Sequence, residues 1–68
     1  MNKVHYNVTG LINEKMKTQV KNVLNKIDGV NSIDVDLARG SVEVGYNDTA
    51  DTKEIAHGIE RVGCRIEE

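Results

Sequence analysis

The 68-residue sequence predicts an α+β fold in which two helices cover one face of a four-stranded antiparallel sheet. Three observations support this prediction. Several segments alternate between apolar and polar residues, which is the pattern of strands with one buried face. Two longer segments repeat apolar residues at every third or fourth position, as the buried side of a helix does. The segments also follow one another in the order strand, helix, strand, strand, helix, strand.

The first strand is expected over residues 3–9, and its buried face holds three apolar residues: Val4, Tyr6 and Val8. The first helix is expected over residues 13–27. Asn13 is a good N-cap for it, because the side-chain oxygen can accept a hydrogen bond from a free amide of the first turn. Asp28 and Gly29 are expected to end the helix. Its buried side is marked by one apolar stripe: Met16, Val20, Val23, Leu24 and Ile27.

A β-hairpin and a second helix are expected next. The hairpin turns around Gly40, and its two strands bury alternate residues. Those residues are Ile33, Val35 and Leu37, then Val42, Val44 and Tyr46. A polar loop leads to the second helix, which has Asp51 or Thr52 as its cap and an apolar stripe of Ile55, Ile59 and Val62. The last strand is expected over residues 64–67, with Cys64 and Ile66 facing the same way.

This order of elements is the ferredoxin-like βαββαβ arrangement, with residues 1–68 forming a single domain. In that arrangement the last strand runs antiparallel beside the first, so the start of one lies next to the end of the other. Cys64 is therefore expected close to the loop between Gly10 and Met16, although the two are far apart in sequence.

The composition excludes several classes of function. The formal net charge is -2, so nothing favours binding to nucleic acid or to an anionic membrane. Tyr6 and Tyr46 share their faces with apolar residues, so they cannot form the aromatic platform on which RNA bases stack. The apolar runs are too short for a membrane span. Cys64 is the one cysteine, which rules out an internal disulfide and suggests a cytoplasmic protein. A chain of this length has no room for a buried catalytic cleft, and we do not expect an enzyme.

Positions throughout the chain, most of them apolar or glycine, follow one family pattern. They include Val8, Gly10, Val20, Leu24, residues 28–30, Ile33, residues 35–37, Gly40, Val42, Val44, Tyr46, Ile55, Ile59, Glu60 and Gly63. With these residues the chain resembles the heavy-metal-associated domain, the fold of small copper chaperones and of modules in copper- and zinc-transporting ATPases. The resemblance implies metal ion binding and metal transport, and docking between such domains.

The metal-binding loop of that family reads Gly-Met-Thr-Cys-x-x-Cys, and its two thiolates hold a soft ion such as Cu(I). Aligned on Gly10, this chain has Leu11 and Ile12 before the ligand positions, Asn13 at the first cysteine and Met16 at the second. The CxxC motif is thus degenerate. An amide is a poor ligand for a soft ion, and a thioether is soft but uncharged.

A relocated pair of sulfurs is one hypothesis for a metal site. Cys64 directly follows Gly63. At the position of Cys64, many bacterial members of the family carry a Tyr that leans over the loop. Met16 and Cys64 would then hold Cu(I) weakly, completed by an exogenous thiol or by a second chain in a metal-bridged dimer. The dipole of the first helix would lower the pKa of a Cys64 thiol that faces its amino end. The alternative is that both sulfurs belong to the core, as Met and free Cys commonly do.

Two functions therefore stay open. The first is a small metal-binding protein of the copper-chaperone type with a divergent loop. The second is a metal-free interaction module that retains the fold and its docking surface. By resemblance, Lys15 and Lys17 are candidates for docking to another heavy-metal-associated domain or to a metal-transporting ATPase. His5 and His57 lie off the apolar faces and are expected to be solvated surface residues.

Overall fold

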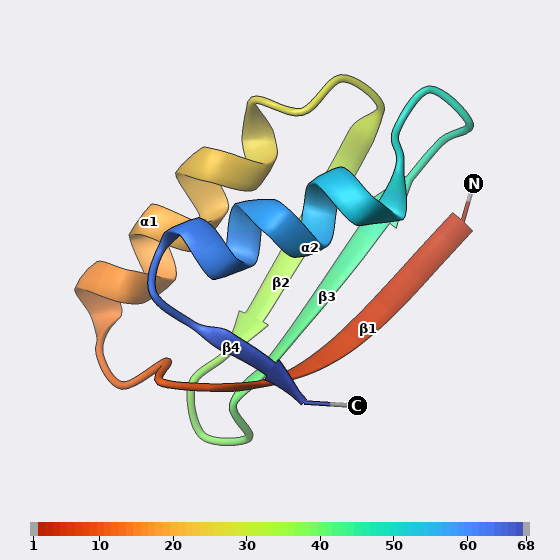
Figure 1. Cartoon of the computed structure of the whole chain (residues 1–68). Coiled ribbons are helices and arrows are strands. Elements are labelled where there is room, and N and C mark those ends of the chain that lie inside the picture. Colours follow the sequence, from red (N-terminus) through yellow and green to blue (C-terminus); the bar gives the residue numbers. More distant parts are fainter. Residues whose placement is uncertain (1, 68) are drawn as a thin grey trace.

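Six elements follow one another in the predicted order, as Figure 1 shows for this computed structural model. The structure describes residues 2–67, so the ends of the predicted domain, Met1 and Glu68, lie outside the described residues. The elements are β1 (Asn2–Thr9), α1 (Glu14–Asn25), β2 (Val30–Asp36), β3 (Ser41–Tyr46), α2 (Thr52–Arg61) and β4 (Arg65–Glu67).

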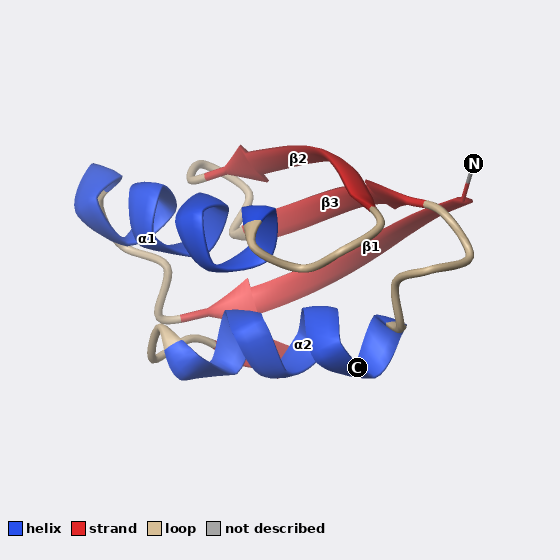
Figure 2. Cartoon of the chain, turned by 90° about the horizontal axis from the view of Figure 1, so that it is seen from above, coloured by secondary structure: helices blue, strands red, loops and turns tan. Residues whose placement is uncertain are grey.

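The four strands form one antiparallel sheet in the order β2-β3-β1-β4. The two strands that lead into the helices, β1 and β3, therefore lie in the middle of the sheet, and the two that follow the helices, β2 and β4, lie at its edges. This is how the predicted ferredoxin-like arrangement is assembled. Both helices lie in front of the sheet in Figure 1, and Figure 2 shows the strands fanning apart with the usual twist. The predicted fold is confirmed.

The core lies between the sheet and the two helices. Its largest fully buried side chains come from positions that the apolar patterns place on buried faces: Val20, Leu24, Val42, Val44, Ile55 and Ile59. Burial of this apolar surface is the main favourable term in folding a chain with so small a core. Most residues on the opposite side of the strands are exposed or half-buried, with Ser41 and Gly45 of the central strand β3 as buried exceptions. The alternation in the sequence thus largely follows the two faces of the sheet.

Several element boundaries differ from the prediction by one or two residues, among them the end of the first helix and the start of the last strand. The first helix was expected to reach residue 27 but ends at Asn25, because the backbone tightens there: the N–H groups of Lys26 and Ile27 bond three residues back, at 3.3 Å and 3.1 Å. The last strand begins at Arg65, one residue later than expected, so Cys64 precedes it. Both changes shorten an element and leave the buried faces unchanged.

The two tyrosines point toward the core, as predicted. Tyr6 and Tyr46 pack against the buried cluster, and the hydroxyl of Tyr6 donates a hydrogen bond to the carbonyl of Thr52, with an O–O distance of 3.2 Å. The exposed sheet face therefore carries no tyrosine on which a base could stack. Among residues 2–67, no helix has the length and apolar character needed to cross a membrane.

Candidate functional site

The loop after β1 and the residue before β4 meet at one end of the sheet. Thr9 pairs with Arg65 across β1 and β4, which places Gly10 beside Cys64. A Cβ built on Gly10 would lie 3.3 Å from the carbonyl oxygen of Gly63 and 3.8 Å from the Cα of Cys64. The expected proximity of Cys64 to this loop is therefore confirmed, and strand pairing is its cause.

Asn13 is the N-cap of α1, as predicted. Its backbone is extended, and its Oδ1 accepts a hydrogen bond from the N–H of Met16 at 2.9 Å. The Asn13 carbonyl accepts the N–H of Lys17 at 3.2 Å, which begins the helical pattern. The side chain at the first family ligand position thus has a defined task in starting the helix.

Met16 and Cys64 both belong to the apolar interior. Cys64 is 5% exposed and is part of the buried cluster, against which Met16 packs from the amino end of α1. Burial raises the pKa of the Cys64 thiol above its ordinary value. This is opposite to the lowering that we expected from the helix dipole, because loss of hydration on burial penalises the thiolate.

The donor set at this end of the fold does not match a soft metal ion. The Asn13 amide is engaged as a cap, the Met16 thioether carries no charge, and the Cys64 thiol is disposed to keep its proton. Within residues 2–67, no three His, Cys, Asp or Glu side chains gather where they could hold a metal ion. The loop is therefore a capped helix end above an apolar interior, and its side chains are not arranged as ligands for a soft ion.

The raised pKa of the Cys64 thiol leads to a testable prediction about its reactivity. The folded protein holds this proton to a higher pH than the unfolded chain does. At a pH below the pKa of this thiol in the unfolded chain, the stability that the group contributes is therefore fully present. It is lost as the pH rises through the folded pKa. We expect an aromatic disulfide reagent at pH 8 to react at least about tenfold more slowly with the folded chain than with the chain in denaturant. The release of the coloured thiol measures both rates. Equal rates would mean an exposed, ionised thiol.

Three residues that reach solvent at the same end, fully or in part, form what we call the loop surface: Ile12, Lys15 and Lys17. Ile12 is 78% exposed and is the large apolar side chain that the described part of the chain leaves in solvent. Lys15 is exposed and Lys17 is half-buried at the start of α1. The sequence indicates the two lysines but not Ile12, because nothing in a short loop shows which of two adjacent apolar residues is buried. Its neighbour Leu11 is the buried one.

The lysines of the loop surface do not help the helix that carries them. Cations at the amino end of a helix oppose its dipole, by about 0.3–1 kcal/mol each. The last turn of α1, which the structure describes in full, carries no basic residue, although a cation there would be favourable. Glu14 in the first turn and Lys26 at the C-cap do suit the dipole, so the opposing charge on α1 is that of Lys15 and Lys17.

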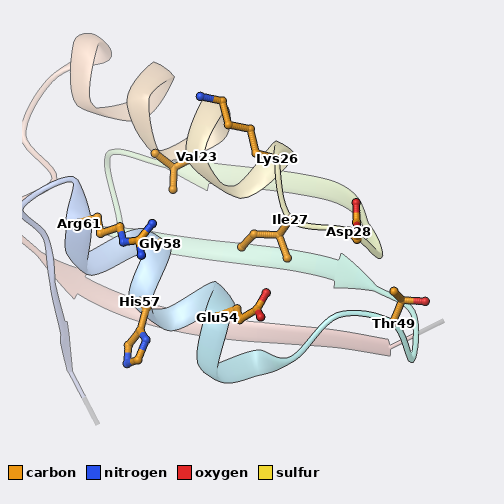
Figure 3. A pocket seen from close by; sticks show the side chains of 9 residues that line it. All are labelled: Val23, Lys26, Ile27, Asp28, Thr49, Glu54, His57, Gly58 and Arg61. Carbon is orange, nitrogen blue, oxygen red and sulfur yellow. The ribbon is translucent and has the colours of Figure 1, made fainter.

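A groove between the two helices lies away from the loop surface. It has a volume of about 660 Å³, and Figure 3 shows it bordered by Val23 and Ile27 of the α1 side and by residues of α2. His57 is one of the lining residues and is exposed, as expected. None of the predicted site residues lines this groove. His5 is also exposed, on the open sheet face, where its Nδ1 lies 3.8 Å from a carboxylate oxygen of Glu43.

Comparison with known sequences gives one family. The model of the heavy-metal-associated domain matches residues 6–64. A copper chaperone CopZ from Staphylococcus aureus (strain JH9) is 46% identical over 43 residues, which is 63% of this chain and 63% of that protein. The alignment thus spans slightly less than two thirds of this curated relative.

Solved structures with the same fold extend the likeness over the whole chain. A CopZ metallochaperone superposes with a TM-score of 0.93 at 34% identity, covering 97% of this chain and all of that one. A copper binding domain from HMA7, a P-type ATPase, gives a TM-score of 0.87 at 24% identity and covers 100% of this chain and 96% of that one. At such low identity the second comparison shows the fold alone.

Proposed function

Because the chain belongs to the heavy-metal-associated domain family, we propose that it acts in copper handling as a docking module that carries no ion in its loop. One observation supports this most directly. The two side chains at the family's ligand positions serve the fold itself, since Asn13 caps α1 and Met16 packs against the core. The family is non-enzymatic, in agreement with the expectation from the sequence.

The partner we propose is another heavy-metal-associated domain, on a copper chaperone or on a metal-transporting ATPase in the cytoplasm. The likeness to CopZ and to the ATPase domain supports a partner of this kind. On this chain the contact would be made by the loop surface. Ile12 offers an apolar anchor, and Lys15 and Lys17 suit a partner surface with carboxylates around a small apolar depression.

A titration tests the docking proposal. The isotope-labelled chain is titrated with the purified heavy-metal-associated domain of the host's own copper-transporting ATPase, and amide NMR shifts are followed. We expect the largest shifts at the loop surface and a dissociation constant raised at least about tenfold by Lys15→Glu or by Ile12→Ser. Lys15→Glu should at the same time stabilise the chain slightly, since it favours the helix dipole. Weaker binding in this variant could not then be ascribed to unfolding.

A matched control uses the other end of the same helix. Lys26 is exposed at the C-cap of α1, so Lys26→Glu makes the same charge change far from the loop surface. This variant should bind as the wild type does, apart from a small long-range effect that added salt removes. Equal weakening by Lys15→Glu and Lys26→Glu would contradict a contact at the loop surface, and so would shifts centred on the groove between the helices.

A second function is favoured by one observation, the pairing of β1 with β4 that places Cys64 beside the Gly10 loop. In this alternative the Cys64 thiolate binds Cu(I) together with Met16, and a second chain or an exogenous thiol completes the site. The ion is then the cargo, and where a second chain completes the site the ion bridges a dimer. The burial of Cys64 opposes this alternative, because the thiol must emerge and lose its proton before it can bind.

A further inference from the structure

The outer edge of β1 is covered along only part of its length. β4 is three residues long and pairs with β1 over Asn7, Val8 and Thr9 alone. Beyond these pairs, no strand within residues 2–67 lies on the outer side of Lys3, Val4 and His5, which we call the free edge. Figure 1 shows this half of β1 along the outside of the sheet, with β4 beside the opposite end.

The backbone groups at the free edge point outward from the sheet. The N–H of Val8 donates to the carbonyl of Gly40 at 2.7 Å, so the backbone of Val8 faces the β3 side. Directions alternate along a strand, and therefore Val4 and Tyr6 face β3 as well. The N–H and C=O groups of Lys3 and His5 then face the free side, as those of Asn7 and Thr9 do where β4 pairs with them.

The side chains of the free edge differ on the two faces of the sheet. Val4 is half-buried on the helix side, where a neighbouring strand would cover it. Lys3 and His5 are exposed on the open face, and they share a single carboxylate: Glu43 lies 3.6 Å from the Lys3 ammonium and 3.8 Å from the His5 ring. The Nε2 of His5 also lies 3.3 Å from Oδ1 of Asn7, whereas the exposed Lys3 ammonium has room to pair with a further carboxylate.

The other edge of the sheet is protected in a way that the free edge is not. β2 is irregular between Val30 and Ser32, where its pairing with β3 shifts register, and it carries Asp34 and Asp36 on its open face. An irregularity of this kind discourages the addition of another strand, and it is this irregularity that distinguishes β2 from the free edge. β1 pairs with β3 in continuous register from Asn2 to Asn7, so its free edge is a regular template.

We propose that the free edge of β1 binds an extended segment of another polypeptide, which adds to the sheet as an antiparallel strand in line with β4. The segment alternates acidic and apolar residues. Its residues opposite Lys3 and His5 exchange backbone hydrogen bonds with them and place carboxylates beside their basic side chains. The residue between them is a branched apolar one that covers Val4.

β4 is the precedent for this mode of binding within the chain itself. Ile66 pairs with Val8 and is half-buried, whereas its neighbours Arg65 and Glu67 are exposed. An incoming strand of the proposed pattern repeats this alternation further along β1. The surface is distinct from the loop surface, so this proposal stands or falls independently of the proposed function.

Hydrogen exchange of the whole chain tests the proposal. The probe is a blocked synthetic peptide of alternating glutamate and valine, and the control is a peptide of the same composition with the two residue types in separate blocks. We expect the alternating peptide at saturation to slow exchange of the Lys3 and His5 amides at least about tenfold, while the Val4 amide, which faces β3, changes less. Protection centred on other residues, or none at millimolar peptide, would overturn the proposal.

Two substitutions at one position sharpen the test. His5→Pro removes an N–H that faces the free side, so it should raise the dissociation constant of the peptide at least about tenfold while leaving the ladder to β3 in place. His5→Ala keeps the N–H and should lose only the smaller contribution of the imidazole. If His5→Pro binds the peptide as the wild type does, the proposal is wrong. Should His5→Pro not fold, the exchange pattern of the wild type decides by itself.

Discussion

Replacing Asn13 and Met16 together by cysteine is expected to give a protein that binds Cu(I) at least about a thousandfold more tightly than the wild type. The two positions are one helical turn apart at the amino end of α1, where free amides and the helix dipole favour thiolates. The exposed loop that carries Asn13 would give an ion access to both sulfurs. The change thus restores what the chain lacks by comparison with the family motif.

This gain comes with a loss of stability that can be measured separately. Asn13 accepts the N–H of Met16, and removal of an N-cap costs about 1 kcal/mol. Cysteine is also smaller than methionine, so the packing of Met16 against the core is weakened. We expect the metal-free double variant to be less stable than the wild type and the Cu(I)-loaded variant to recover that loss, because binding to the folded state alone stabilises it.

An anaerobic competition titration against a chromophoric Cu(I) chelator measures the affinities. The single variant Asn13→Cys is the matched control, since it adds one thiolate without its partner and should fall well short of the double variant. Wild type and Cys64→Ser should compete equally poorly. Strong competition by the wild type that disappears in Cys64→Ser would instead overturn the metal-free docking module and support the relocated site at Cys64.

Gly29→Ala is expected to lower the free energy of unfolding by about 2–5 kcal/mol. Gly29 has φ of +93°, and a Cβ there would lie 2.5 Å from the backbone nitrogen of Ala50 and 2.7 Å from Oδ1 of Asn47. The neighbouring loop cannot easily yield. Asn47 donates its N–H to the carbonyl of Gly29 at 2.8 Å, and its Oδ1 accepts the N–H of Thr49 at 2.9 Å. A domain of this size has about 5 kcal/mol in total, so much of the population should unfold.

Gly63→Ala is the matched control, because Gly63 has a left-handed backbone like Gly29 but has room for a Cβ. Gly63 has φ of +102°, but a Cβ there meets no heavy atom within 4 Å. This variant isolates the cost of the left-handed backbone, about 1–2 kcal/mol. Denaturant unfolding followed by circular dichroism gives both values. Equal losses would show that the Gly29 loop moves aside and that the close approach is not a constraint.

The fold was predictable from the sequence because each element carries its own periodicity. The alternation around Val4, Tyr6 and Val8 is a property of any strand with one buried face. The Asn13 cap could likewise be found, since capping depends on residues that are adjacent in the chain. Even the meeting of Cys64 with the Gly10 loop followed from the order of elements, because the antiparallel pairing of the first and last strands leaves one geometry for their ends.

The sequence by itself determined the ferredoxin-like architecture and the absence of both loop cysteines. Only the tertiary structure decided the state of the sulfurs and the exposed surface. Whether the Cys64 thiol ionises depends on how many atoms exclude water from it, and those atoms come from distant parts of the chain. For the same reason the loop buries Leu11 and exposes Ile12, two apolar neighbours that no local pattern distinguishes. Burial is a sum over contacts in space, whereas periodicity is a property of neighbours in sequence.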